Sequence, residues 1–175
     1  MRRIGVIVAL GALLSMIGGV MTAAPALAGG RGDGWQVLPL PPTFTEPADH
    51  CGFPIQGTQD IANVFVKVLK TVDGSTIFLA TGAAKITFTN PDNGKSISVN
   101  ASGPGKFIAN ADGSVIALGK GLQAIGLSPA EQALTGLPGQ FVSAGALTAT
   151  ADANGNLISL TLQGHILVNI CAALS

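Results

Sequence analysis

Charge and aromatic residues are both scarce in this chain of 175 residues. Charged residues make up 10% of the sequence, against about 25% in an average soluble protein. Nine Lys and Arg residues balance nine Asp and Glu residues, tyrosine is absent, and the aromatic residues are seven Phe and one Trp. A basic surface for phosphates and a stacking platform for bases are therefore not expected. We expect no nucleic-acid partner, and few sugar-binding troughs are built with so few aromatic rings.

The motifs of common catalytic and metal sites are missing as well. The serines lie in no Gly-x-Ser-x-Gly elbow, which is the nucleophile motif of many hydrolases. Two Cys and two His residues stand far apart in the chain and match no zinc-binding spacing. We therefore expect neither a metal ion nor a cofactor.

The first 28 residues have the pattern of a secretory signal peptide. Two arginines precede an uncharged apolar stretch over 4–20, and Ala26-Leu27-Ala28 supplies the small residues that signal peptidase accepts. The alternative is a retained anchor, because about 20 apolar residues can span a bilayer. Cleavage before Gly29 would remove the two arginines and change the net charge from 0 to −2. We expect a secreted, extracellular protein with no membrane span after cleavage.

Two cysteines, Cys51 and Cys171, fit an oxidising compartment and allow one intramolecular disulfide. A reactive thiol or a metal ligand is the functional alternative. The disulfide would join the start of the folded domain to its last strand. We therefore divide the chain into a signal peptide over 1–28, a flexible Gly- and Pro-rich tail over 29–50, and a disulfide-closed β-domain over 51–175.

Four Asx-Gly pairs punctuate the β-domain, and such pairs are strong hairpin signals. An isoleucine stands three residues after each glycine, so every segment reads [Asp/Asn]-Gly-x-x-Ile. The four pairs are Asp73-Gly74, Asn93-Gly94, Asp112-Gly113 and Asn154-Gly155. We expect four hairpins with type I′ turns and with the same face directed inward.

Apolar and polar residues alternate between these turns, as they do in half-buried strands. The predicted strands cover 61–71, 75–81, 84–90, 95–102, 105–110, 114–119, 140–152 and 157–169. About eight antiparallel strands joined by tight turns favour an all-β up-and-down barrel or, as the alternative, a two-sheet sandwich. Closure of a barrel would also protect long, weakly charged edge strands from aggregation.

One segment departs from this pattern. Ser128 and Glu131 form a capping box around Pro129, and Gly136 can end the helix. These residues predict a short helix over 129–135. It is either a connector at one end of the sheet or a lid over a cavity mouth.

Several turn and cysteine motifs occur together in the β-domain: Cys51-Gly52-Phe53-Pro54, Thr81-Gly82, Asn93-Gly94-Lys95-Ser96-Ile97, Gly103-Pro104-Gly105, and Gly164-His165 ahead of Cys171. With the signal peptide, they make the chain resemble the small secreted β-rich proteins common in actinobacteria. That group has no established activity. The resemblance therefore implies export and an all-β fold, and it assigns no functional residue.

His165 is the one weak candidate for a catalytic residue. It lies on the polar face of the last predicted strand, and a nearby Asp60, Asp73 or Asp152 would let it exchange protons near neutral pH. A histidine on a polar strand face is more often simply solvated.

Two candidate interaction surfaces also follow from the alternation. Thr87, Thr89, Ser96 and Ser98 would share an uncharged, hydroxyl-rich face of one hairpin. Phe65 and Leu69 lie on the parity opposite the valines of strand 61–71. They are covered either by a second layer or by a ligand or another molecule.

The leading hypothesis is a secreted binding or surface-interaction protein without catalytic activity. Its partner would be a small apolar ligand or a component of the cell surface, and the protein would be a monomer or a weak homo-oligomer. One alternative is a small barrel enzyme of the isomerase or cyclase type, with His165 as the polar handle for an apolar substrate. A second alternative is a structural protein of the cell envelope.

Overall fold

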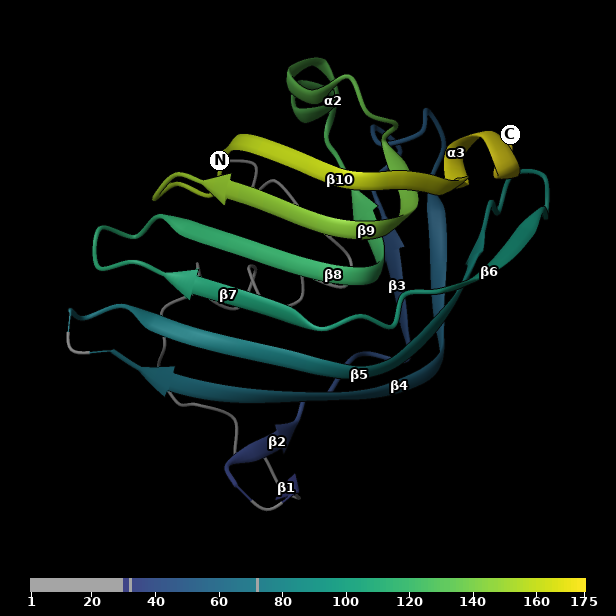
Figure 1. The fold of residues 1–175 in the computed structure, drawn as a ribbon. Helices are drawn as coiled ribbons and strands as arrows, with labels where there is room; N and C mark the ends of the chain where they lie inside the picture. The colour runs from purple at the N-terminus through teal and green to yellow at the C-terminus, as the bar shows by residue number, and fades with distance from the viewer. Residues whose placement is uncertain (1–29, 32, 72) are drawn as a thin grey trace.

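The computed structural model describes residues 30–31, 33–71 and 73–175 (Figure 1). The predicted signal peptide lies outside the described residues. The strands in chain order are β1 (Gly30–Arg31), β2 (Trp35–Val37), β3 (Thr43–Glu46), β4 (Ile55–Lys70), β5 (Thr76–Thr89), β6 (Ser96–Asn100), β7 (Gly105–Ala109), β8 (Val115–Gly126), β9 (Gln140–Ala151) and β10 (Leu157–Asn169). Helix α2 (Pro129–Thr135) precedes β9, and α3 (Ile170–Leu174) follows β10.

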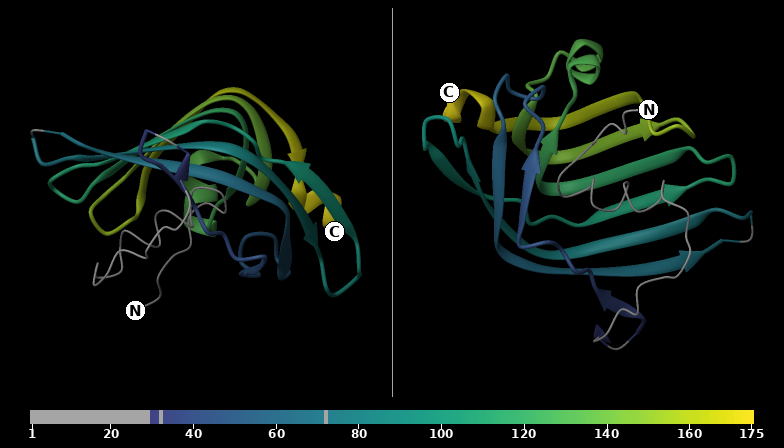
Figure 2. Two further views of the ribbon diagram at one scale, coloured as in Figure 1. Left: turned by 90° about the horizontal axis from the view of Figure 1, so that it is seen from below. Right: turned by 180° about the vertical axis from the view of Figure 1, so that it is seen from behind.

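The all-β, antiparallel architecture is confirmed, but the barrel is not formed. The strands make one sheet in the order β1-β2-β4-β5-β7-β8-β9-β10, with β3 added to β4 and β6 added to β5. No pairing in the described part of the chain joins β10 to the other end of that order. The sheet instead bends into an open arch with a convex outer face and a concave inner face (Figure 2). This arch resembles the sandwich alternative, because the parts of the sheet on the two sides of the bend face each other across the interior (Figure 2).

The bend lies within the long β4–β5 hairpin. A register shift between Gln59 and Ile61 interrupts β4, and such bulges bend a strand. On β5 the backbone of Gly82 has φ +147°, and a Cβ there would lie 2.1 Å from the carbonyl oxygen of Asn63. Thr81-Gly82, expected to be a turn between two strands, is therefore a bend inside one continuous strand.

Beyond this bend, four strand segments form an arm that we call the wing. It consists of β3, residues 55–59 of β4, residues 84–89 of β5, and β6. The remainder, which we call the main sheet, consists of β1, β2, residues 61–70 of β4, residues 76–81 of β5, and β7 to β10.

Two apolar clusters fill the arch. One lies under the main sheet and includes Phe107, Phe141 and Leu147. The other joins the wing to the far ends of β8, β9 and β10, and includes Ile86, Phe88 and Val142 with Ile170 and Leu174 of α3. The wing therefore has an apolar inner face, which packs in the second cluster, and a polar outer face.

All four Asx-Gly pairs connect antiparallel neighbours, as predicted: β4 to β5, β5 to β6, β7 to β8, and β9 to β10. The turns are not of type I′, because each glycine has positive φ while its Asx partner does not. In the β7–β8 turn the Gly113 amide donates to the Asn110 carbonyl oxygen at 3.0 Å. The arrangement is the longer hairpin in which a left-handed glycine follows a type I turn.

Helix α2 has the predicted bounds and caps. The Ser128 hydroxyl accepts a bond from the Glu131 amide, the Glu131 carboxylate accepts one from the Ser128 amide, and Gly136 ends the helix with φ +69°. The stretch 29–50, for which composition predicts a flexible tail, contains β2 and β3, both paired with β4. Those strands gain the ladder hydrogen bonds that a tail would lack, which local composition does not reveal.

The predicted disulfide between Cys51 and Cys171 is present, with the two Cα atoms 5.1 Å apart. It joins the loop before β4 to α3. Asn90 and Asn93, in the β5–β6 turn, both donate amide hydrogen bonds to the Leu174 carbonyl oxygen, at 3.0 and 2.9 Å. The C-terminal helix is thus fastened to the wing on two sides.

Candidate functional site

The outer face of the wing carries two parallel rows of uncharged polar side chains. The first row is Thr43, Thr58, Thr87 and Ser98, and the second is Thr45, Gln56, Thr89 and Ser96. Neighbours within each row are cross-strand partners on β3, β4, β5 and β6. Strands lie about 4.8 Å apart, and every second residue recurs after about 6.7 Å. We call these eight residues the hydroxyl platform.

The platform follows from period-two alternation in four short segments. Its Thr and Ser residues flank Phe44 in β3, Phe88 in β5 and Ile97 in β6, which point toward the interior. Phe88 is fully buried, and Phe44 and Ile97 are partly buried against the same cluster. Because successive residues in a strand face opposite sides, burying these apolar side chains turns the hydroxyls outward. The hydroxyl platform is therefore the outer side of strands whose inner side packs in the second apolar cluster.

Most of the platform hydroxyls are available to a ligand. Thr87 Oγ1 donates to Asp60 Oδ2 at 2.7 Å and lies 2.6 Å from Ser98 Oγ. The side chains of Thr43, Thr45, Thr58, Thr89 and Ser96 make no hydrogen bond within the described part of the chain. The rows contain no charged residue; Asp60 and Lys85 lie beside them.

The four predicted surface residues Thr87, Thr89, Ser96 and Ser98 thus lie together, as pairs Thr87–Ser98 and Thr89–Ser96. The other half of the platform, on β3 and the start of β4, lies outside the strands predicted from the sequence. The signal in β3 is the alternation Thr43-Phe44-Thr45, the same pattern as Thr87-Phe88-Thr89. This pattern falls in the stretch 29–50, whose Gly- and Pro-rich composition predicts a tail.

Phe65 and Leu69 lie elsewhere, on the outer face of the main sheet. Phe65 is half-buried and pairs with Val37 of β2 and Thr81 of β5. Leu69 is 39% exposed and pairs with Ile77. The structure therefore does not join these two residues to the hydroxyl platform in one surface patch.

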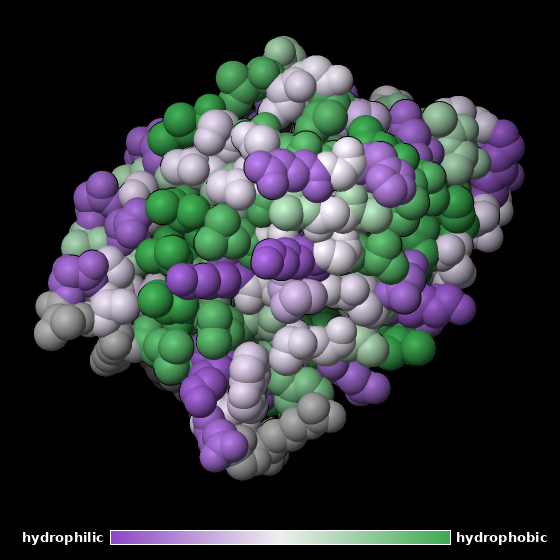
Figure 3. Space-filling model, viewed as in Figure 1, coloured by the Kyte–Doolittle hydropathy of each residue, from purple (hydrophilic) through white to green (hydrophobic). Residues whose placement is uncertain are grey.

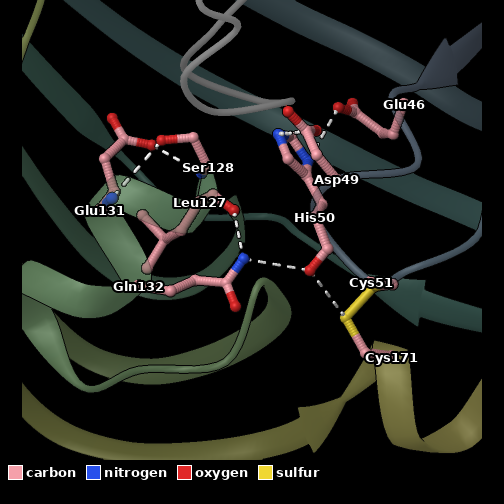
Figure 4. Close-up of polar contacts among 9 residues, drawn as sticks. All are labelled: Glu46, Asp49, His50, Cys51, Leu127, Ser128, Glu131, Gln132 and Cys171. Atoms are coloured by element: carbon pink, nitrogen blue, oxygen red, sulfur yellow. Dashed lines mark hydrogen bonds and ion pairs between the residues drawn. A yellow bond between two sulfur atoms is a disulfide. The ribbon is translucent and has the colours of Figure 1, made fainter.

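A buried polar cluster lies beneath α2, next to the disulfide (Figure 4). His50 is buried, and its Nδ1 atom lies 3.5 Å from Glu46 Oε2. Burial raises the pKa of Glu46 from 4.5 to about 7. The backbone carbonyl of His50 accepts a hydrogen bond from Gln132 Nε2 at 3.1 Å, which links this loop to α2.

Gln140 completes this cluster at the start of β9. It is fully buried, and neither of its amide atoms has a hydrogen-bond partner among the described protein atoms; the same holds for His50 Nδ1. Gln140 and His50 approach each other across Gly126, where an added Cβ would lie 2.7 Å from Gln140 Oε1 and 3.3 Å from His50 Nδ1. The cluster has the groups for proton exchange, but none of these residues lines the cavity inside the arch.

A cavity of about 50 Å³ lies inside the arch, lined mainly by apolar residues, with Gln59, Thr81 and Gln123 as its polar lining. One buried water needs about 10–15 Å³, whereas small-molecule sites occupy about 300–1,000 Å³. The cavity therefore has room for a few waters and not for an apolar ligand of drug size. Helix α2 does not line it, which supports the connector reading of that helix over the lid.

His165 is exposed on β10 and pairs with Ala144. Asp73 and Asp152 occupy hairpin tips, where hydrogen bonds from Thr71 and from Asn156, respectively, hold the pKa of each carboxyl below its usual value. Asp60 bonds to Thr87 on the wing. Asp152 precedes His165 by 13 positions along the β9–β10 hairpin, so most of a strand separates the two side chains. The structure does not bring His165 together with these candidate partners.

Among the described residues, no three His, Cys, Asp or Glu side chains gather as a metal site. Within the same ranges, no helix is long and apolar enough to cross a membrane. No protein-family model matches the chain, and searches of curated proteins and of solved structures give no match.

Proposed function

We propose that this chain is a secreted, non-catalytic binding protein that attaches to neutral, hydroxyl-rich polymers through the hydroxyl platform. The observation that carries the proposal is the ordered double row of Thr, Ser and Gln side chains across four strands, six of them exposed and the two on β5 half-buried. The predicted signal peptide and the Cys51–Cys171 disulfide support an extracellular location. The proposed ligand is a neutral extracellular polysaccharide.

The chemistry of the platform matches that class of ligand. Each Thr or Ser hydroxyl can donate one hydrogen bond and accept others, and a Gln side chain can do both, so the array pairs with sugar hydroxyls in either sense. The absence of charge within the rows favours a neutral ligand over an ionic one. Repetition across strands compensates for weak individual contacts, because many sites on one polymer act together.

This mode of binding differs from aromatic stacking in a sugar trough. The platform contains no aromatic residue, and Phe44 and Phe88 point to the opposite side of the wing. Binding would therefore rely on hydrogen bonds at an extended surface. Short oligosaccharides, which contact few positions, should bind much more weakly than long chains or particles.

The experiment is co-sedimentation of the purified protein with insoluble neutral polysaccharides, cellulose and chitin among them. Thr58→Val combined with Thr89→Val removes two central hydroxyls and keeps β-branched side chains suited to a strand. We expect at least a tenfold loss of binding to the polymer that the wild type binds. The matched control is Thr161→Val, on the exposed face of β10, which should bind as the wild type does.

Two results would overturn the proposal. One is wild-type protein that stays in the supernatant with every neutral polymer tested. The other is binding that the double variant retains in full while its circular dichroism and melting temperature match the wild type. Loss of binding in Thr161→Val as well would place the contact outside the platform.

A further inference from the structure

The outer face of the main sheet carries a row of four large aliphatic side chains. Leu69, Ile77, Ile108 and Ile116 are successive cross-strand partners on β4, β5, β7 and β8. Leu69 is 39% exposed and the other three are half-buried, and no second sheet among the described residues covers them. Three strand spacings make this row about 14 Å wide.

The adjacent row on the same face alternates lysine with leucine. Its members, again successive partners, are Lys67, Leu79, Lys106 and Leu118. Lys120 follows two residues beyond Leu118 on β8 and is exposed. Figure 3 shows this face, with apolar side chains toward the hairpin tips and hydrophilic ones among and beside them. We call the six aliphatic residues and three lysines the lysine–aliphatic face.

The three lysines are not neutralised by the protein. Neither Lys67, Lys106 nor Lys120 forms an ion pair within the described part of the chain, where the ion pairs both involve His50. The two rows contain no acid. The nearest acids along these strands, Asp73 and Asp112, belong to the hairpin tips and accept hydrogen bonds inside their own turns.

Unpaired lysines among partly exposed aliphatic side chains favour some classes of partner for this face over others. A second copy of the same face would bring lysine against lysine, which disfavours self-association through it. A neutral polymer gains nothing from the lysines. Exposed apolar patches with a polar rim are typical of protein or membrane contacts. Lysine stems cover apolar surface while their ammonium groups reach outward, the arrangement that suits anionic headgroups above an apolar layer.

We propose that the lysine–aliphatic face docks on the surface of a membrane rich in anionic phospholipid, with Lys67, Lys106 and Lys120 on the headgroups and the aliphatic rows against the interface. The contact is peripheral and involves no spanning segment. It is independent of polymer binding, because the hydroxyl platform lies on the wing, beyond the bend in β4 and β5. Together, the two surfaces would let one molecule hold a polymer next to a lipid layer.

The test is sedimentation of the purified protein with phosphatidylcholine vesicles that contain or lack phosphatidylglycerol. Each lysine near an anionic surface contributes about fivefold to binding, so Lys67→Gln, Lys106→Gln and Lys120→Gln together should reduce affinity about 100-fold. Leu79→Thr with Leu118→Thr should weaken binding without changing its salt dependence. Lys85→Gln removes one positive charge from the wing and is the matched control for the single variant Lys106→Gln, which removes one from the lysine–aliphatic face.

We expect binding only to the anionic vesicles, weakened by salt and by the lysine variants, and unchanged by Thr58→Val with Thr89→Val. Absence of binding to anionic vesicles overturns the proposal, as does equal binding by the triple lysine variant when its melting temperature is that of the wild type. A dimer in analytical ultracentrifugation that Leu79→Thr and Leu118→Thr dissociate would also overturn it, by assigning the face to a second copy.

Discussion

The ring of Phe44 occupies the space that a side chain at Gly57 would fill. The two residues are cross-strand partners on β3 and β4, and a Cβ added to Gly57 would lie 2.0 Å from Phe44 Cζ. The same ring meets Phe88 edge-on, with centroids 6.1 Å apart. This contact fastens β3, and with it Thr43 and Thr45, to the rest of the hydroxyl platform.

Replacing Gly57 by Ala should displace the Phe44 ring and loosen β3. Overpacking of this kind typically costs about 1–3 kcal/mol, measurable as a lower free energy of unfolding in urea. In a Phe44→Leu background, where the ring is gone, Gly57→Ala should have a much smaller effect. If Gly57→Ala lowers the free energy of unfolding equally in both backgrounds, the position of the Phe44 ring does not require glycine at position 57.

Stability should depend on pH through Glu46. Burial raises its pKa from 4.5 to about 7, so between these values the folded protein holds a proton that the unfolded chain has released. The free energy of unfolding should therefore fall as pH rises from 4.5 to 7, by up to about 3 kcal/mol for this group. His50 lies beside Glu46, and Asp49 lies on the other nitrogen of the His50 ring, at 3.9 Å.

The check is urea unfolding of wild type and Glu46→Gln across that pH range. The variant should lack the Glu46 part of the slope, because glutamine does not titrate. The exposed Asp73, Asp112 and Asp152, whose pKa values are lowered by hydrogen bonds within their turns, act in the opposite sense and below about pH 4. Parallel curves for the two proteins between pH 4.5 and 7 would contradict the assignment.

Removal of the disulfide should destabilise the fold more than any single surface change. Cys51 and Cys171 are 120 positions apart, and closing a loop of that size stabilises by ~4–5 kcal/mol in the chain-entropy model. We expect Cys51→Ser with Cys171→Ser to lower the melting temperature by roughly 10–20 °C. A melting temperature within a few degrees of the wild type would mean that Asn90, Asn93 and the apolar cluster hold α3 without the disulfide.

Local rules in the sequence account for the hairpins, the α2 helix and the disulfide. Asx-Gly pairs favour tight reversals, the Ser128–Glu131 box satisfies free amides at a helix start, and only one pairing of two cysteines exists. The four platform residues on β5 and β6 were predictable for the same reason, since they lie on one hairpin. The prediction of a turn at Thr81-Gly82 was wrong. A glycine with positive φ can also form a bend within a strand, where another backbone passes close to it.

By itself, the sequence determined which residues alternate, where the chain reverses, and which face of each strand is apolar. Whether the sheet closes was decided only by the tertiary structure, because closure depends on the summed bend and twist of many strands and not on any one of them. The same is true of β3, whose pairing with β4 relies on Phe44 meeting Gly57 and Phe88. Both proposed binding surfaces depend on this strand pairing, since a row across four strands exists only once distant segments are in register.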